Sequence, residues 1–250
     1  MKTFKFALMC AAAIALVACT PNGNEPVNKC DVCGQDPCVC QEDPGFVSMI
    51  SVTDNSLADW DNLPAEYLVV TTHDEGCSKD GLKSVKVFAD EVYINLLVEY
   101  NTEVVTDLSS VPFHLYLDCD NSAETGGGVS QWVEPQTEIL LEGWFYADGE
   151  PCEYIPELFA WSGAVGVNDW AWEGLTAAAV FSASQVVDGK VEIQLLHELI
   201  PGTWNETSFN VGFDIQQDWN SVGYLPNAAD DELGNSVLAS LLNVKFYRGE

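Results

Sequence analysis

Short runs of β-branched and aromatic residues, separated by turn residues, dominate the chain from about residue 46 onward. In residues 111–117, for example, Phe113, Leu115 and Leu117 occupy alternate positions, so they share one face of an extended strand. Gly, Asp, Asn and Pro interrupt the runs at short intervals, as is typical of turns between strands. We therefore predict strands over residues 67–72, 82–88, 92–100, 111–117, 137–146, 154–161, 177–182, 191–195, 209–215 and 244–247.

Many short strands with few helix signals indicate an all-β domain. We predict a jelly-roll or immunoglobulin-like sandwich of two antiparallel sheets over residues 46–250. Residues 89–91 supply the tight turn of the clearest hairpin, and residues 233–242 are expected to form one short helix. The domain contains no internal repeat.

Residues 1–18 have the order of a secretory signal: a positive start, an apolar stretch and small residues at the end. Lys2 and Lys5 carry the charge, and residues 6–17 are apolar but shorter than the about 20 residues of a membrane-spanning helix. The stretch ends in Leu-Val-Ala directly before Cys19, which resembles the lipobox of bacterial lipoproteins. The resemblance implies cleavage before Cys19 and its acylation by fatty acids such as palmitate. An ordinary signal peptide with an unrelated cysteine is the alternative.

Residues 19–45 have the composition of a disordered tether, because Pro, Asn, Gly and acids leave almost no large apolar side chain. This segment contains a cluster formed by Cys30, Cys33, Cys38 and Cys40. Four thiolates can hold Zn²⁺ tetrahedrally, and the Cys-x-x-Cys-Gly half resembles a zinc knuckle. The two pairs are only four residues apart, which is shorter than in zinc ribbons. In an exported chain two disulfides are slightly favoured over zinc, and both alternatives stay open.

The chain is strongly acidic, with 39 Asp and Glu against 9 Lys and Arg and a net charge of −30. Such a surface repels phosphate backbones, which excludes nucleic acid as a partner. The charge is consistent with solubility alone or with cation binding. The 47% hydrophobic content is sufficient for one sizeable core, and no stretch after Cys19 is long and apolar enough to span a membrane.

Five motifs stand in a characteristic order along the domain. They are Asn-Ser-Leu-Ala-Asp-Trp at residues 55–60, the hairpin over 82–98, Tyr-Leu-Asp-Cys-Asp-Asn-Ser-Ala-Glu-Thr-Gly at 116–126, Val-Glu-Ile-Gln-Leu at 191–195 and Phe-Asn-Val-Gly-Phe-Asp-Ile at 209–215. This order resembles the carbohydrate-binding module family 9-like, or DOMON-like, β-sandwich domains, over roughly residues 47–247. The resemblance implies a jelly-roll-like sandwich that binds a sugar, often together with calcium.

A group of oxygen-bearing residues follows the strand predicted over 111–117: Asp118, Asp120, Asn121 and Glu124. Carboxylate and amide oxygens at short spacing suit Ca²⁺, which takes several oxygen ligands at once. The spacing differs from that of an EF-hand loop. A plain turn, in which Asp and Asn bind their own backbone, is the alternative. The family resemblance favours calcium.

Tryptophan, with eight residues, is the second notable feature, because exposed flat rings stack against the C–H faces of sugars. Trp60, Trp144 and Trp161 lie in strand-like or motif sequence, and we expect them to pack. The ligand candidates in loop-like sequence are Trp132, Trp170, Trp172 and Trp219, with Asn168 and Asp169 as polar neighbours. In an extended segment Trp170 and Trp172 would point to one side.

Together these features predict a non-catalytic, lipid-anchored protein of the cell envelope that captures oligo- or polysaccharide. We expect it on the outer membrane, at its periplasmic side or the cell surface, with outer-membrane uptake proteins as further partners. A glycoside hydrolase is the main alternative, but the many acids nominate no particular catalytic pair. Haem binding, known in some DOMON-like domains, is disfavoured because Met49 is the only methionine after the signal. A structural lipoprotein without a small ligand is the third alternative.

Overall fold

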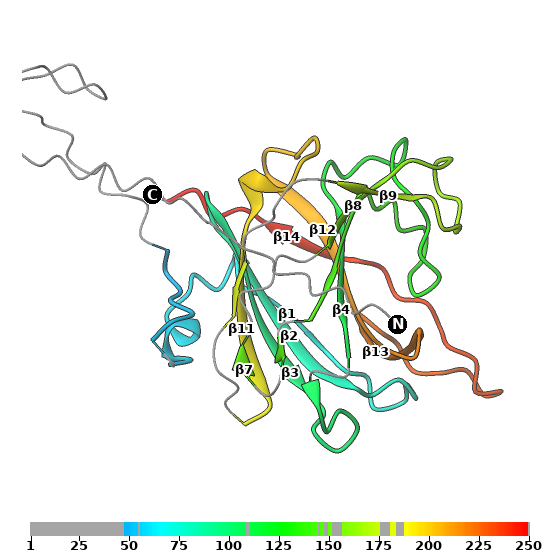
Figure 1. Ribbon diagram of the computed structural model, residues 1–250, viewed down its shortest axis with the longest axis horizontal. Coiled ribbons are helices and arrows are strands. Elements are labelled where there is room, and N and C mark those ends of the chain that lie inside the picture. The colour runs from blue at the N-terminus through cyan, green and yellow to red at the C-terminus, as the bar shows by residue number, and fades with distance from the viewer. Residues whose placement is uncertain are drawn as a thin grey trace, which may run out of the picture. The chain divides into compact units, whose positions relative to one another are not determined.

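Two antiparallel β-sheets face each other in the computed structural model (Figure 1). The structure describes residues 48–54, 56–108, 111–144, 146–147, 150–151, 157–175, 181–183 and 188–249. Contacts divide the chain into the units 1–45 and 46–250, and every described residue lies in the second. The predicted all-β sandwich of two antiparallel sheets is therefore confirmed, whereas Cys19, the tether and its cysteine cluster lie outside the described residues.

The first sheet has five strands, in the order β1-β2-β3-β11-β10. Its strands are β1 (Val69–Thr72), β2 (Leu82–Ala89), β3 (Tyr93–Tyr100), β10 (Phe181–Ala183) and β11 (Lys190–Leu196). Every neighbouring pair is antiparallel. The β2–β3 turn forms as the sequence predicts, because the Asp90 carboxylate accepts the backbone N–H groups of Val92 and Tyr93 at 2.9 and 2.7 Å.

The second sheet has seven strands, in the order β13-β12-β4-β5-β8-β9, with β14 beside β12. Its strands are β4 (Phe113–Asp118), β5 (Ile139–Gly143), β8 (Glu157–Trp161), β9 (Trp172–Leu175), β12 (Ser208–Gln217), β13 (Asn220–Leu225) and β14 (Leu242–Lys245). A separate pair joins β6 (Tyr146–Ala147) to β7 (Glu150–Pro151). The described chain also contains the 3-10 turns η1 (Ala58–Asp61) and η3 (His197–Leu199).

Alternation along the strands builds the core between the sheets. On β4, Phe113, Leu115 and Leu117 join the main apolar cluster, whereas His114 and Tyr116 point to the outer side of the sheet. Successive strand residues point to opposite faces, so the predicted period of two places these side chains correctly. The main core is therefore formed by the inward side chains of the two sheets, which pack against each other.

The outer side of the five-stranded sheet is covered by residues 48–54 and 56–63, which we call the N-terminal strap (Figure 1, blue to cyan). Trp60 of the strap is buried against Phe88 and Leu97, and its Nε1 donates to the Glu192 carboxylate at 2.8 Å. The expectation that Trp60 packs is confirmed. Gln194 adds a second attachment by donating to the Ile50 carbonyl at 3.3 Å. The strap therefore closes a second, smaller apolar core.

The helix predicted over residues 233–242 is wrong, because this segment forms a turn and irregular chain, then a bridge from Ala239 to Trp132 and the first residue of β14. The Asp231 carboxylate accepts the backbone N–H groups of Leu233 and Asn235, both at 2.8 Å. Such local bonds compete with a helical hydrogen-bond pattern. Within the described part of the chain, no helix has the length and hydropathy of a membrane span.

The Glu192 carboxyl ties the stability of the domain to pH. Burial raises its pKa from 4.5 to about 7, the charges of Asp54 and Asp59 add to the rise, and the Trp60 hydrogen bond opposes it. The folded protein thus keeps a proton that the unfolded chain releases near pH 4.5, so this contribution to stability is lost as pH rises towards 7. Glu192→Gln keeps the acceptor for Trp60 without the charge.

We expect Glu192→Gln to raise the free energy of unfolding relative to the unaltered protein by roughly 1–3 kcal/mol at about pH 8, and by little at about pH 5. Urea unfolding at both pH values measures the difference. Glu66→Gln, at an exposed position, is the matched control and should give parallel curves. An equal difference at both pH values would show that Glu192 does not titrate in the folded domain.

Candidate cation and ligand sites on the seven-stranded sheet

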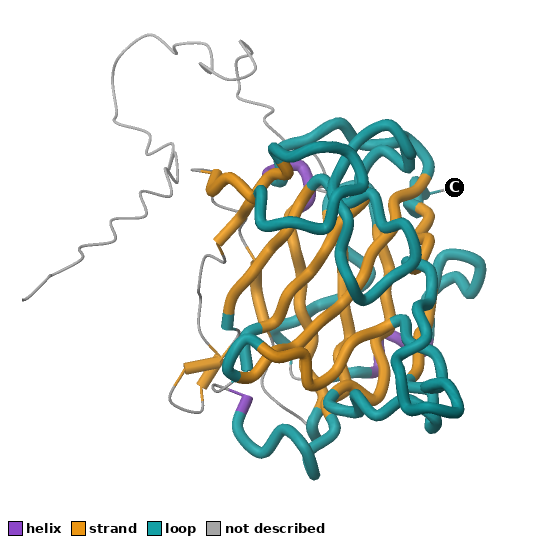
Figure 2. The backbone as a smooth tube through the Cα atoms, turned by 90° about the vertical axis from the view of Figure 1, so that its right-hand side faces the viewer, coloured by secondary structure: helices purple, strands orange, loops and turns teal. Residues whose placement is uncertain are grey.

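The outward side chains of the seven-stranded sheet fall into rows that cross neighbouring strands. The strand register gives the rows Asp214–His114–Glu142 and Gly212–Tyr116–Leu140. A third row joins Asn210 to Asp118, and Glu138 continues it because its backbone N–H donates to the Leu117 carbonyl at 2.9 Å. In Figure 2 loop segments lie in front of the strands of this sheet. Its outer side is therefore partly covered and partly open.

The third row ends in a carboxylate cluster made of Asp118, Asp120 and Glu138. One oxygen from each residue lies within 4.8 Å of those of the other two. Asp118 is the last residue of β4, Asp120 follows in the turn, and Glu138 directly precedes β5. The antiparallel pairing of β4 with β5 thus brings together acids that are far apart in sequence.

Most oxygens of the cluster already accept hydrogen bonds. Asp118 accepts from the Asn210 side chain at 2.7 Å and from the Asn121 N–H at 2.8 Å. Asp120 accepts from the Thr125 hydroxyl at 3.1 Å. Glu138 Oε2 accepts from the Cys119 N–H at 2.8 Å. These bonds fix the three carboxylates in place before any ligand arrives.

Glu138 Oε1 of the cluster and Asn121 Oδ1 of the turn that follows β4 are buried, and neither has a hydrogen-bond donor among the described residues. An unsatisfied buried acceptor costs free energy, so each such atom calls for an explanation. Gly126 lies beside the first of them with φ +73°, and a Cβ there would come within 2.6 Å of Glu138 Oε1. The loop thus approaches the carboxylate at a point where only glycine fits.

Burial and mutual repulsion disfavour the charged form of the carboxylates in the cluster. Burial raises the pKa of Glu138 to about 7, and the charges of Asp118 and Asp120 add to the rise. Burial likewise raises the pKa of Asp118, and Asp120 contributes in the same direction. A hard divalent cation neutralises such repulsion and takes carboxylate and amide oxygens as ligands, so the donor set fits Ca²⁺.

The structure changes the predicted ligand set in one respect. Asp118 and Asp120 lie together as expected, and Asn121 lies beside them with its amide nitrogen donating to the Ser208 carbonyl at 2.8 Å. Glu124 is exposed in the turn and does not belong to the cluster. Glu138 takes that place. The even spacing of Glu138 with the outward Leu140 and Glu142 is the sequence signal that could have found it.

Aromatic side chains gather at the β8–β9 edge of the same sheet. The Trp170 ring is 66% exposed and meets Phe159 edge-on, with ring centroids 6.2 Å apart. Trp172 is half-buried and contacts Trp161 and Tyr116 at centroid distances of 5.2 and 6.2 Å. Phe159, Trp161 and Tyr116 all belong to the outer side of the sheet, so Trp170 and Trp172 share that side.

The polar neighbours predicted for this edge are available to solvent. Asn168 and Asp169 are both exposed in the loop between β8 and β9. The Asp169 carboxylate accepts the Trp170 N–H at 2.6 Å, which leaves its second oxygen for a ligand. Trp161 packs as expected, because its ring lies between Gly127 and Gly163, where any Cβ would collide with it. The open aromatic face at this edge is therefore that of Trp170.

Trp132 is not an exposed platform, contrary to the prediction. Its side chain is 1% exposed and its Nε1 donates to the Pro226 carbonyl at 2.9 Å. The ring lies on the backbone of β12 at Gly212, where a Cβ would come within 2.7 Å of it. Tyr116 and Tyr224 pack against its edges at 5.7 and 6.2 Å. Trp132 is a core residue of the covered outer face.

Trp219 is exposed, as predicted, but it does not join the other aromatic residues. It is 79% exposed at the turn between β12 and β13, with φ +65°. Strands β13 and β9 lie at opposite ends of the sheet order. The four predicted tryptophans therefore divide into an edge pair, a buried residue and a distant hairpin tip.

The row Asp214–His114–Glu142 has the residue types of a catalytic site, but Asp214 and His114 are buried and Glu142 is only slightly exposed. His114 Nε2 lies 3.0 Å from the Glu142 carboxylate, and His114 is 2% exposed. Asp214 is fully buried, and the side chains of Gln131 and Gln216 donate to it at 3.1 and 2.7 Å. Their contacts link β12, β4 and β5.

No protein-family model matches the chain, and no curated protein matches it. Functional assignment therefore depends on the side chains themselves. The lipidation of Cys19, and the two disulfides or zinc site of Cys30, Cys33, Cys38 and Cys40, lie outside the described residues and stay predictions. Within the described part, Cys77 and Cys119 are buried free thiols.

The burial of Trp132 predicts a large effect on stability. Trp132→Ala removes the ring that covers Gly212 and should lower the free energy of unfolding by about 3–5 kcal/mol. The matched control is Trp219→Ala, at an exposed position, which should change it by no more than about 0.5 kcal/mol. Thermal and urea unfolding measure both. Similar values for the two variants would mean that Trp132 is not packed in solution.

Proposed function

We propose that this chain is a lipid-anchored glycan-binding protein of the cell envelope that acts without catalysis. The observation that carries the proposal is the exposed Trp170 ring beside Trp172 at the β8–β9 edge. The anchor rests on the sequence around Cys19. The ligand is oligo- or polysaccharide, and outer-membrane uptake proteins are the expected neighbours.

The β8–β9 edge supports sugar binding for two physical reasons. Exposing an indole ring to water costs free energy, and the exposed Trp170 ring lies in a group of aromatic side chains rather than alone, which favours an interaction role. Asn168 and Asp169 place hydrogen-bonding groups next to that ring, and hydroxyls of a stacked sugar need such partners. Because the edge is open rather than a closed cavity, it suits a chain of sugar units.

The carboxylate cluster supports a bound calcium ion. Asp118, Asp120 and Glu138 would supply carboxylate oxygens, and Asn121 Oδ1 would supply an amide oxygen. The Gly126–Gly128 segment that follows the acids packs on Trp161 through Gly127, and Gly128 donates to the Val167 carbonyl at 3.0 Å. Calcium would therefore order the loop that supports the aromatic edge.

Glycan binding is tested with variants of the exposed tryptophans. Trp170→Ala should weaken binding to the recognised polysaccharide at least tenfold, which corresponds to about 1.4 kcal/mol of lost stacking. Trp219→Ala, equally exposed but at the other end of the sheet, should bind normally. Affinity electrophoresis through gels containing soluble plant and host polysaccharides measures both. Full binding by the Trp170→Ala/Trp172→Ala double variant would refute this edge as the site.

Calcium binding is tested by titration calorimetry with CaCl₂. We expect one site with a Kd in the range of about 10⁻⁶–10⁻³ M. Asp120→Asn and Glu138→Gln each remove a charged ligand and should weaken binding at least about tenfold. Glu124→Gln is the matched control, because this acid stands outside the cluster, and it should bind as the unaltered protein does. A loss confined to Glu124→Gln would contradict the proposed ligand set.

A further inference from the structure

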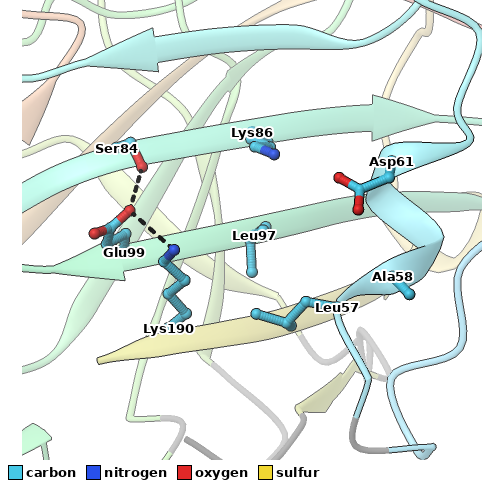
Figure 3. Close-up of a pocket in the computed structure, with 8 residues that line it drawn as sticks. All are labelled: Leu57, Ala58, Asp61, Ser84, Lys86, Leu97, Glu99 and Lys190. Atoms are coloured by element: carbon cyan, nitrogen blue, oxygen red, sulfur yellow. Dashed lines mark hydrogen bonds and ion pairs between the residues drawn. The ribbon is translucent and has the colours of Figure 1, made fainter. Parts of the chain in front are cut away.

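The N-terminal strap and the outer side of the five-stranded sheet enclose a pocket of about 330 Å³ (Figure 3). Its floor comes from β2, β3 and β11, and its rim comes from η1 and the residue before it. The pocket lies on the opposite sheet from Trp170 and the carboxylate cluster. It is therefore a separate site from the one proposed above.

Part of the pocket lining is apolar, although polar groups make up most of its exposed surface. Leu97 of β3 forms part of the floor and is 6% exposed, and Leu57 lies beside it at the start of η1 (Figure 3). Ala58 extends the apolar rim. Because Trp60 anchors η1 in the second core, these side chains sit on a fixed element rather than on a loose loop. A ligand would find the apolar surface already formed.

Two charged groups of the pocket lining are available to a ligand. Lys86 is half-buried, and its ammonium makes no hydrogen bond or ion pair within the described part of the chain. Asp61 lies at an exposed position, and its carboxylate likewise has no partner among the described residues. They form no ion pair with each other although both line the pocket. The pocket therefore offers a hydrogen-bond donor, Lys86, and an acceptor, Asp61, that do not bond each other.

The other charges of the pocket are already fixed. Lys190 lies 3.7 Å from the Glu99 carboxylate, and the Ser84 hydroxyl donates to the same carboxylate at 3.2 Å. The two lysines and the two acids of the lining cancel in charge. In a chain with only nine Lys and Arg and a net charge of −30, two lysines in one pocket make a locally neutral site on an acidic protein.

We propose that this pocket binds one neutral, hydroxyl-rich ring, such as a single sugar unit. A hydroxyl both donates and accepts, so one diol can accept from Lys86 and donate to Asp61, and the apolar face of the ring covers Leu97. The neutral lining offers no excess charge to an anion, which the surrounding acidity repels. A zwitterionic amino acid is the competing ligand, because it carries the two charges on one small frame.

The experiment follows backbone amide shifts by NMR in the ¹⁵N-labelled protein, titrated with methyl glucoside, methyl galactoside, glucuronate or glycine. We expect saturable shifts with a methyl glycoside at Leu57, Asp61 and Leu97, and weaker ones with glucuronate and glycine. Lys86→Met keeps the aliphatic stem but not the ammonium, and Asp61→Asn removes the charged acceptor. Each should weaken the glycoside Kd at least about tenfold, because a hydrogen bond to a charged group is lost.

Lys83→Met, on the same strand but outside the pocket, is the matched control and should leave the Kd unchanged. Trp170→Ala should also leave it unchanged, which separates this site from the aromatic edge. Absence of shifts at the pocket residues with every probe would overturn the site. Saturable shifts with glycine or glucuronate, but with neither glycoside, would overturn the ligand class.

Discussion

The contact between the Trp132 indole and the backbone of Gly212 is the interaction on which the outer half of the domain depends. A glycine in the middle of the long strand β12 leaves room for a ring to lie flat on the sheet. The ring then bonds the Pro226 carbonyl, and its neighbour Gln131 bonds Asp214. The segment between β4 and β5 is thereby fastened over the sheet, with its first turn beside Glu138. The turn that carries Asp120 is held separately, because the Cys119 N–H donates to Glu138 at 2.8 Å.

Alternation made the main strands predictable, because burial on one face imposes the same period on the sequence. The sequence did not predict strands β9 and β13, because they contain Gly, Asn or Ser. Pairing with β8 and with β12 makes these segments strands. For residues 233–242 the apolar residues imitate a helical pattern, but Leu233 is 88% exposed and Asp231 binds the backbone locally. In each case a contact distant in sequence, or a local side-chain bond, decides the conformation.

The residues of the candidate sites also differ in how far the sequence predicts them. Asp118 and Asp120 are adjacent in sequence and could be found there, whereas Glu138 joins them only through the pairing of β4 with β5. The sequence could not separate the exposure of Trp170 from the burial of Trp132, since both residues lie among Gly and polar residues. Trp132 is buried because Gly212, which is distant in sequence, has no side chain and leaves room for the ring. The pocket under the strap likewise combines residues from four separate segments.

The strap also has a mechanical consequence. It is where the chain enters the folded unit, so tension transmitted from preceding residues acts first on the outer side of the five-stranded sheet. A load drawn through Trp170 acts on the opposite sheet. The line of force between these two points crosses the apolar layer between the sheets rather than running along one ladder of hydrogen bonds. Cohesion in that layer is non-directional and shared by many side chains, so resistance to pulling is spread over the whole interface.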